Sequence, residues 1–108
     1  MSEFLNKIKI LVYQNQVLVS SHGYDELNAD NIRVREVLQG VENAITIREY
    51  PDYGKGPCIL LLQRDKQGQP IHVVWGIEKD TEKPAVIVTA YRPDPKQWNA
   101  DFISRRKS

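Results

Sequence analysis

Three apolar stretches of strand length dominate the second half of the chain, at residues 58–62, 71–77 and 85–91. Parallel strands need a crossover of a dozen or more residues, usually a helix, and the linkers between these stretches are too short for one. The linker 65–68 is polar, ends in glycine and is typical of a hairpin turn. We therefore expect the three stretches to pair as antiparallel neighbours.

A further strand is expected before these three. In residues 44–50, Ile45 and Ile47 alternate with polar residues, which is typical of an edge or half-exposed strand. The linker 51–57 is a loop by its glycine and proline content. Four strands joined by short loops predict an antiparallel meander.

The first half of the chain has helical periodicity instead. Apolar residues at spacings of three and four predict an amphipathic helix over 3–14, with Ser2 as its cap. Residues 17–19 form a short extended stretch after it. The apolar positions of the helix are Phe4, Leu5, Ile8, Leu11 and Val12.

The segment that follows fits either two short helices or one longer helix. In the first alternative, Ser21 caps a helix over 22–30, which Asn31 ends in the left-handed conformation. A second helix then stops at Gly40. In the other alternative, one helix runs over 28–39. We favour the two short helices.

These elements together predict an α+β domain, in which N-terminal helices pack on a four-stranded antiparallel sheet. The length of 108 residues suits a single domain, 1–108. Residues 98–108 are expected to form a short helix with a basic tail at 103–108.

The charge of the chain is nearly balanced, with 15 Lys+Arg against 14 Asp+Glu. This balance argues against a protein that binds nucleic acid over a large basic surface. Residues 83–108, however, carry 6 basic and 2 acidic side chains. The sequence therefore allows a small, localised contact with RNA.

Three features of the sequence indicate the cellular compartment. The single cysteine, Cys58, excludes an intramolecular disulfide framework and fits a reducing environment. No apolar run reaches the ~18 residues that cross a bilayer, and the N-terminus lacks the pattern of a signal peptide. We expect a cytoplasmic protein that makes no contact with a membrane.

No motif for a metal or a bound phosphate is present. His22 and His72 are 50 residues apart, which gives no paired ligand spacing of the structural zinc kind. The glycines of residues 54–56 lack the strand, helix and following Ser/Thr of a phosphate-binding loop. The sequence predicts neither a metal nor a cofactor.

Several polar groups are expected to meet on one face of the sheet. Strand alternation puts His72 on one face of its strand. In the neighbouring strand, Ile87, Thr89 and Tyr91 share a face. If the two faces coincide, an imidazole, a hydroxyl and a phenol stand together, with Arg92 at the end of the strand.

The two histidines suit acid and base catalysis. His22 heads the short helix, four residues before Glu26 on the same helix face. Cleavage of RNA through its own 2′-hydroxyl needs a group that accepts a proton and another that donates one. Imidazole titrates near pH ~6.5 and suits both roles without a metal, and Arg92 can offset the phosphorane charge. The alternative is structural, with each histidine held by hydrogen bonds as a core or capping group.

A series of short motifs over residues 17–102 resembles the DUF4258 family of small bacterial proteins. That family is similar to the RelE-like toxins of toxin–antitoxin systems, which combine helices with an antiparallel sheet and cleave RNA without a metal. Glu26 and Asp30 depart from the pattern, because many members carry arginine there. The matching residues are Ser21, His22, Leu27, Asn31, Ile32, Val37, residues 70–74 and 89–95, and Trp98.

The resemblance implies a metal-independent, toxin-like ribonuclease with an antitoxin protein as partner. The catalytic residues expected are His22, His72 and Tyr91. The residues expected to bind the substrate are Glu26, Thr89, Arg92 and Trp98.

Two other hypotheses compete with the ribonuclease. One is a non-catalytic binding module that uses the same sheet face, and the other is an accessory protein that forms a homodimer through an edge strand. Histidine rings within about 8 Å of each other in one cleft favour the enzyme, and burial among apolar neighbours favours a structural role. The aromatic residues available to a binding module are Tyr53, Tyr91, Trp98 and Trp75, of which Trp75 is expected in the core.

Overall fold

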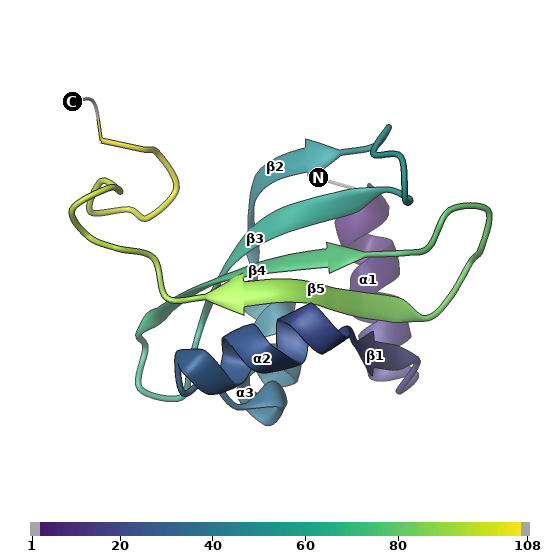
Figure 1. The fold of residues 1–108 in the computed structure, drawn as a ribbon, viewed down its shortest axis with the longest axis horizontal. Helices are drawn as coiled ribbons and strands as arrows, with labels where there is room; N and C mark the ends of the chain where they lie inside the picture. Colours follow the sequence, from purple (N-terminus) through teal and green to yellow (C-terminus); the bar gives the residue numbers. More distant parts are fainter. Residues whose placement is uncertain (1–2, 107–108) are drawn as a thin grey trace.

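The structure is a computed structural model that describes residues 3–106 (Figure 1). Its helices are α1 (Glu3–Tyr13), α2 (Ser21–Ala29) and α3 (Val34–Gly40), followed by a 3₁₀ turn, η1 (Val41–Asn43). Its strands are β1 (Val17–Val19), β2 (Ile45–Tyr50), β3 (Cys58–Arg64), β4 (Pro70–Gly76) and β5 (Ala85–Tyr91). The strands form one mixed sheet in the order β1-β5-β4-β3-β2, so the α+β class is confirmed.

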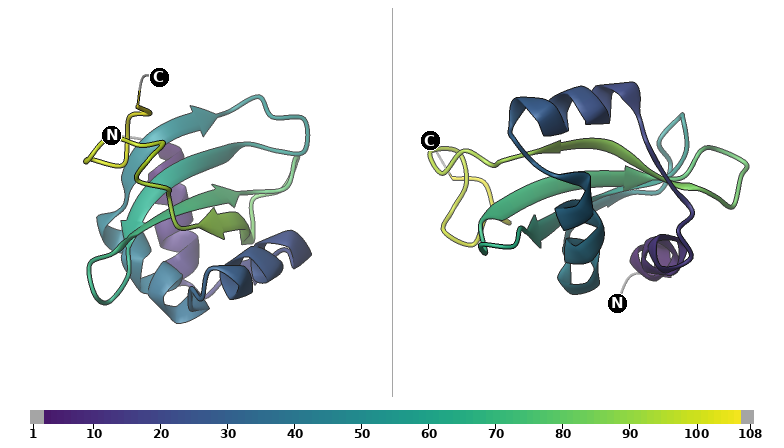
Figure 2. Two further views of the ribbon diagram at one scale, coloured as in Figure 1. Left: turned by 60° about the vertical axis from the view of Figure 1, so that its left-hand side comes forward. Right: turned by 90° about the horizontal axis from the view of Figure 1, so that it is seen from below.

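The helices divide between the two sides of the sheet. α1 and α3 lie on one side, whereas α2 runs along the β5 edge on the side away from them (Figure 2). α1 presents Leu5, Ile8 and Leu11 to the core, one apolar stripe at helical spacing. The core residues from the other elements are Leu27, Ile32, Val37, Val41, Ile59, Leu61, Ile71, Val73, Trp75, Ile77, Ala85, Ile87 and Ala90.

The sheet has one strand more than the four that the sequence predicts. β1 pairs with β5 in parallel, with Val17 opposite Ala85 and Val19 opposite Ile87. The predicted wholly antiparallel sheet is therefore wrong in detail, although β2 to β5 are antiparallel as expected. Residues 17–19 were expected to be extended, but three residues carry too little periodicity to indicate a strand pairing.

The two short helices are confirmed in place of the single longer one. The cap of α2 is Ser20 rather than the predicted Ser21, and its Oγ accepts a hydrogen bond from Gly23 N. Asn31 has a φ of 54°, as expected for the residue that ends the helix. Ser2, the predicted cap of the first helix, lies outside the described residues.

The predicted C-terminal helix is wrong. Residues 98–106 form turns, and Trp98 pairs with Arg105 in an isolated antiparallel bridge. Phe102 takes a φ of 58°, which no helix continues through. We call residues 94–106 the tail loop. The end of the predicted basic tail, residues 107–108, lies outside the described part of the chain.

A bulge in β5 separates side chains that the sequence places together. Val74 pairs with Thr89, but the next residue, Trp75, pairs with Ile87, so Val88 is the extra residue. Ile87 is buried in the core, and Thr89 and Tyr91 lie on the opposite face. The expectation that Ile87 shares their face is wrong for this reason.

Gly23 sets how closely α2 approaches β5. A Cβ at this position would lie 2.6 Å from Ile87 O and 3.2 Å from Val88 O, both rigid backbone atoms. Alanine favours helix by up to ~1 kcal/mol over glycine, yet we expect Gly23→Ala to lower the free energy of unfolding by about 2 kcal/mol. Urea denaturation tests this.

The matched control is Gly54→Ala, because a Cβ at Gly54 meets no atom within 4 Å. We expect that variant to stay within about 0.5 kcal/mol of the wild type. Gly23→Ala as stable as Gly54→Ala would show that α2 can shift away from β5 at no cost.

Candidate functional site

The strands present a second face on the side away from α1 and α3, which we call the open face; α2 lies along its β5 edge (Figure 2), and the tail loop covers it at His72. Residues directly opposite each other in an antiparallel pair point to the same face. His72 lies opposite Tyr91 and Leu62, and Val74 lies opposite Thr89. The predicted grouping of His72, Thr89 and Tyr91 on one face is therefore present.

His72 is fully buried beneath the tail loop. Its Nε2 lies 2.7 Å from Phe102 O, and its Nδ1 lies 3.2 Å from the Tyr91 hydroxyl. Trp98 packs edge-on against the imidazole, with ring centroids 4.5 Å apart. The residue predicted as a catalytic acid or base is thus closed off from solvent, at 0% exposure.

The protonation state of His72 follows from its partners. Burial lowers its pKa, an effect that the hydrogen bond with Phe102 only partly offsets, so the ring is neutral near pH ~7. A carbonyl oxygen only accepts, so Nε2 carries the proton and donates to Phe102 O. Nδ1 is then an acceptor, and the Tyr91 hydroxyl donates to it. His72 therefore fixes both Tyr91 and the tail loop.

His22 lies elsewhere, in the first turn of α2. Its side chain is 68% exposed, and its Nε2 lies 3.8 Å from Glu26 Oε1. One histidine is thus at the surface of a helix, and the other, His72, is enclosed between the sheet and the tail loop. The structure does not bring the two rings into one open cleft.

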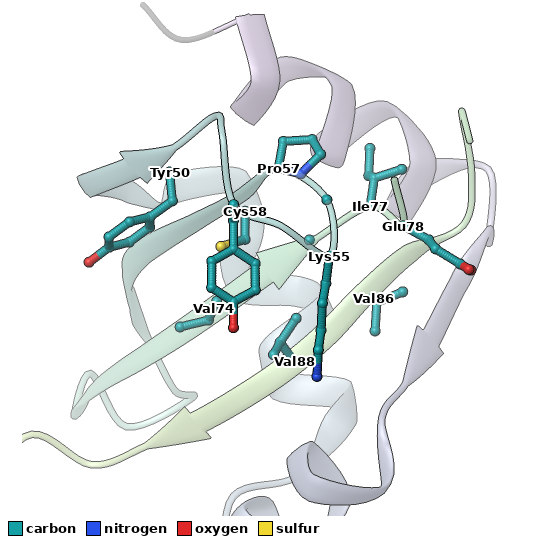
Figure 3. Close-up of a pocket in the computed structure, with 12 residues that line it drawn as sticks. Tyr50, Lys55, Pro57, Cys58, Val74, Ile77, Glu78, Val86 and Val88 are labelled. Carbon is teal, nitrogen blue, oxygen red and sulfur yellow. The ribbon is translucent and has the colours of Figure 1, made fainter. Parts of the chain in front are cut away.

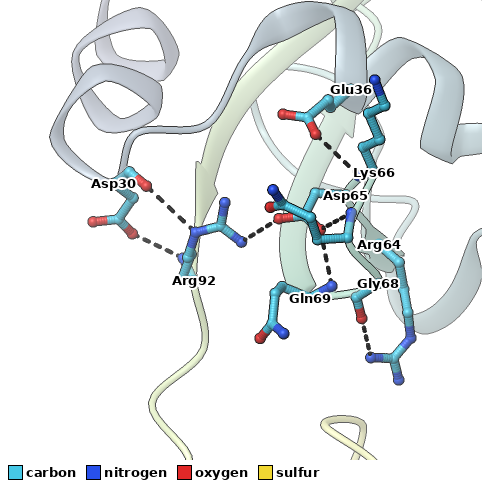
Figure 4. Close-up of polar contacts among 9 residues, drawn as sticks. Asp30, Glu36, Arg64, Asp65, Lys66, Gly68, Gln69 and Arg92 are labelled. Carbon is cyan, nitrogen blue, oxygen red and sulfur yellow. Dashed lines mark hydrogen bonds and ion pairs between the residues drawn. The ribbon is translucent and has the colours of Figure 1, made fainter.

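Arg92, predicted to bind substrate, is held by the protein itself (Figure 4). Its Nη1 lies 3.0 Å from Asp65 Oδ2, its Nε donates to Asp30 O, and its backbone N–H donates to Asp30 Oδ2. These contacts tie the end of β5 to the end of α2 and to the β3–β4 turn. Trp98, also predicted to bind substrate, packs on His72 and is nearly buried.

The Asp65 carboxylate is the centre of that network. Burial raises its pKa, but hydrogen bonds from the backbone N–H groups of Gln69 and Gln67 and the charge of Arg92 outweigh this, so the pKa is lowered. Asp65 is therefore ionised at neutral pH and compensates the charge of Arg92.

Two tyrosines and two arginines lie on or beside the open face, and the Arg105 guanidinium lies 5.3 Å from the centre of the Trp98 ring. Burial raises the pKa of the Tyr91 phenol, the nearby charge of Arg105 lowers it, and nearby Tyr50 raises it. The Arg48 guanidinium lies 5.4 Å from the centre of the Tyr50 ring, within the range of a cation–π contact. We call Arg48, Tyr50, Tyr91 and Arg105 the tyrosine patch.

Sequence reasoning found Tyr91, included Arg105 in the basic segment 83–108 that allows a local contact with RNA, and missed Arg48 and Tyr50. Arg48 and Tyr50 stand two apart on β2, opposite Leu60 and Cys58, so alternation alone could have placed them on one face. Arg105 gives no such signal, because the tail loop returns it to the sheet through turns.

A groove of about 490 Å³ adjoins the patch on the open face (Figure 3). Val74, Val86 and Val88 are among its apolar lining, and Tyr50 belongs to both the groove and the patch. Cys58 also lines it, and burial raises the pKa of this thiol, which is therefore protonated at neutral pH.

Within residues 3–106, no three His, Cys, Asp or Glu side chains lie close enough to hold a metal ion. None of the helices in that range is long and apolar enough to cross a membrane.

Comparison with known proteins gives one result. The family model described as "Domain of unknown function (DUF4258)" matches residues 19–92. No curated protein and no solved structure matches the chain. The matched region runs from the end of β1 to Arg92, so α1 and the tail loop lie outside it. Since this region is more than half of the chain, the protein belongs to the DUF4258 family of domains of unknown function.

Proposed function

We propose that this protein is a cytoplasmic binding module that holds single-stranded RNA on the open face of its sheet. The observation that carries the proposal is the tyrosine patch, in which two exposed arginines lie against aromatic rings: Arg48 is 5.4 Å from the centre of the Tyr50 ring, and Arg105 is 5.3 Å from the centre of the Trp98 ring. Aromatic side chains stack on unpaired bases of any sequence, and arginines pair with phosphates.

The resemblance to RelE-like toxins supports RNA as the ligand. It also makes an antitoxin protein the partner expected to compete for the same face. The small size of the patch agrees with a chain whose formal charge is only +1. A few phosphate contacts predict moderate affinity with a shallow dependence on salt.

RNA cleavage is the second candidate function, and Tyr91 is the observation that favours it. Its raised pKa keeps the hydroxyl protonated near pH ~7, so it can donate a proton to a leaving oxygen while Arg105 offsets phosphorane charge. In this proposal His72 is a positioning residue that holds the hydroxyl, and solvent water takes the proton of the 2′-hydroxyl, because His22 lies elsewhere, on the surface of α2.

The binding proposal is tested by fluorescence anisotropy with a short labelled oligoribonucleotide in the presence of a chelator. We expect Arg105→Gln and Tyr50→Leu each to weaken binding about tenfold. The matched controls are Arg35→Gln on α3 and Tyr13→Leu on α1, both exposed and behind the sheet, which should bind as the wild type does.

Equal losses in Arg105→Gln and Arg35→Gln would mean that general charge attraction, and not the patch, holds the RNA. The same samples run on a gel test cleavage. Product from the wild type that falls sharply in Tyr91→Phe supports the second candidate. Absence of product from the wild type removes that candidate and leaves the binding module standing.

A further inference from the structure

The groove beside the tyrosine patch has a preformed shape. The loop before β3 closes over the end of β4, where Ile77 N donates to Pro57 O and Lys79 N donates to Lys55 O. Gly56 makes this closure possible, because its φ is 130° and a Cβ there would lie 2.2 Å from Ile77 O. The groove therefore exists without a ligand to organise it.

The floor of the groove is apolar. Val74, Val86 and Val88 line it, and Gly76 between them leaves depth, since a Cβ there would press on Val88 and Cys58 at 3.3–3.4 Å. Tyr50 and Tyr53 add aromatic rings to its lining. Apolar surface and aromatic rings suit a planar aromatic ring system.

The charged side chains at the rim distinguish one part of the groove from another. Figure 3 shows the Lys55 side chain extended along the groove toward Val88, and Glu78 turned outward beyond Val86. An anionic group on the ligand is therefore favoured beside Lys55 and disfavoured beside Glu78. A planar ring that carries a phosphate at one end fits both the shape and the charge.

We propose that this groove holds one unpaired nucleobase, with its phosphate on Lys55. A groove of about 490 Å³ admits a single nucleotide and excludes a base-paired stem. Tyr50, which belongs to the groove and to the patch, joins the two regions, so adjoining phosphates of the same strand reach Arg48. The inference rests on the proposed RNA function and names the part of the open face that takes the base.

The probes that test the inference are adenosine 5′-monophosphate, adenosine and ribose 5-phosphate, titrated separately while backbone amide signals are followed by NMR. We expect the monophosphate to shift amides of Cys58, Gly76 and Val88 and to bind at least about fivefold more tightly than either fragment. Lys55→Gln should weaken the monophosphate and leave adenosine unchanged. Tyr53→Leu should weaken both. Both substituted side chains are exposed, so the fold should persist.

Three results would overturn the inference. Ribose 5-phosphate that binds as tightly as the monophosphate would reduce the site to an anion on Lys55. Shifts confined to residues outside the groove would place the nucleotide elsewhere. Unchanged affinity in Tyr53→Leu would exclude stacking in the groove.

The oligoribonucleotide separates this inference from the proposed function. RNA binding that depends on Arg105 but not on Tyr53 or Lys55 would refute the groove site and leave the binding module intact. Monophosphate binding in the groove without any oligoribonucleotide binding would support the nucleotide site and refute the RNA-binding function.

Discussion

Replacing His72 with alanine is expected to lower the free energy of unfolding by about 4 kcal/mol. The imidazole is fully buried, so its loss opens a cavity between the sheet and the tail loop. Phe102 O and the Tyr91 hydroxyl also lose their partner. Urea unfolding measures the loss, and amide hydrogen exchange in residues 99–106 should rise because the tail loop is released.

The second histidine of the chain provides the control. His22→Ala removes an exposed ring and should change stability by less than about 0.5 kcal/mol. Equal stabilities of the two alanine variants would show that the contacts of His72 contribute nothing to the fold.

Burial also makes the contribution of His72 to the free energy of unfolding depend on pH. Its pKa is lowered from the usual 6.5, so below that pH the unfolded chain binds the proton more readily than the folded chain. Stability is then fully present above pH ~6.5 and falls as the pH drops from there to the lowered folded pKa. His72→Gln, which cannot titrate, should lose this slope, and His22→Ala should keep it.

The sequence predicts the fold where the pattern is local. The apolar runs that became β3, β4 and β5 lie close together in the chain, so their length and linkers were sufficient. β1 pairs with a strand that begins at Ala85, and no local pattern in three residues can indicate so distant a partner. Residues 98–108 are predicted as a helix, but Asp101 Oδ1 accepts hydrogen bonds from Ile103 N and Ser104 N and forms a local turn instead. The closure of this turn over the sheet depends in addition on the contact of Phe102 O with His72.

The candidate site shows the same limit. Alternation correctly placed His72 with Thr89 and Tyr91, because register is preserved between them. It could not show that a carbonyl 30 residues further along, Phe102 O, closes over the ring. Because of that contact, His72 is a buried structural group and not a catalytic base. The residues proposed to bind RNA are therefore Tyr50 and the other members of the tyrosine patch.

Replacing Asp65 with alanine should lower the free energy of unfolding nearly as much as replacing His72. Its side chain is 2% exposed and accepts hydrogen bonds from Gln67 N and Gln69 N, both at 2.9 Å. Asp65→Ala leaves these two donors without their acceptor and the buried Nη1 of Arg92 without its ion-pair partner. We expect the free energy of unfolding to fall by about 3 kcal/mol at neutral pH.

Low pH should remove the contribution of the Asp65 carboxylate to the free energy of unfolding. The pKa of Asp65 is lowered from the usual 3.8 in the folded chain, so its stabilisation is complete above that value and is lost as the pH falls through the folded pKa. Asp65→Asn keeps the shape and one acceptor oxygen but not the charge, and should retain about half of the stability that alanine loses. Stability that is equal in the wild type and Asp65→Ala would contradict the network.

Arg92 then distinguishes a structural arginine from one that binds RNA. In a double-mutant cycle, Asp65→Ala and Arg92→Gln should be coupled by about 2 kcal/mol, because each removes the same buried ion pair. Arg92→Gln should nevertheless bind the oligoribonucleotide as the wild type does when both are fully folded, whereas Arg105→Gln should not. A loss of RNA affinity in Arg92→Gln equal to that in Arg105→Gln would restore Arg92 to the substrate-binding role that the sequence predicts. The two arginines carry the same charge but differ in their contacts. Arg92 pairs with the buried Asp65 carboxylate, whereas the exposed Arg105 contacts Gln97 and the Trp98 ring. This pair of variants therefore tests the assignment of the open face directly.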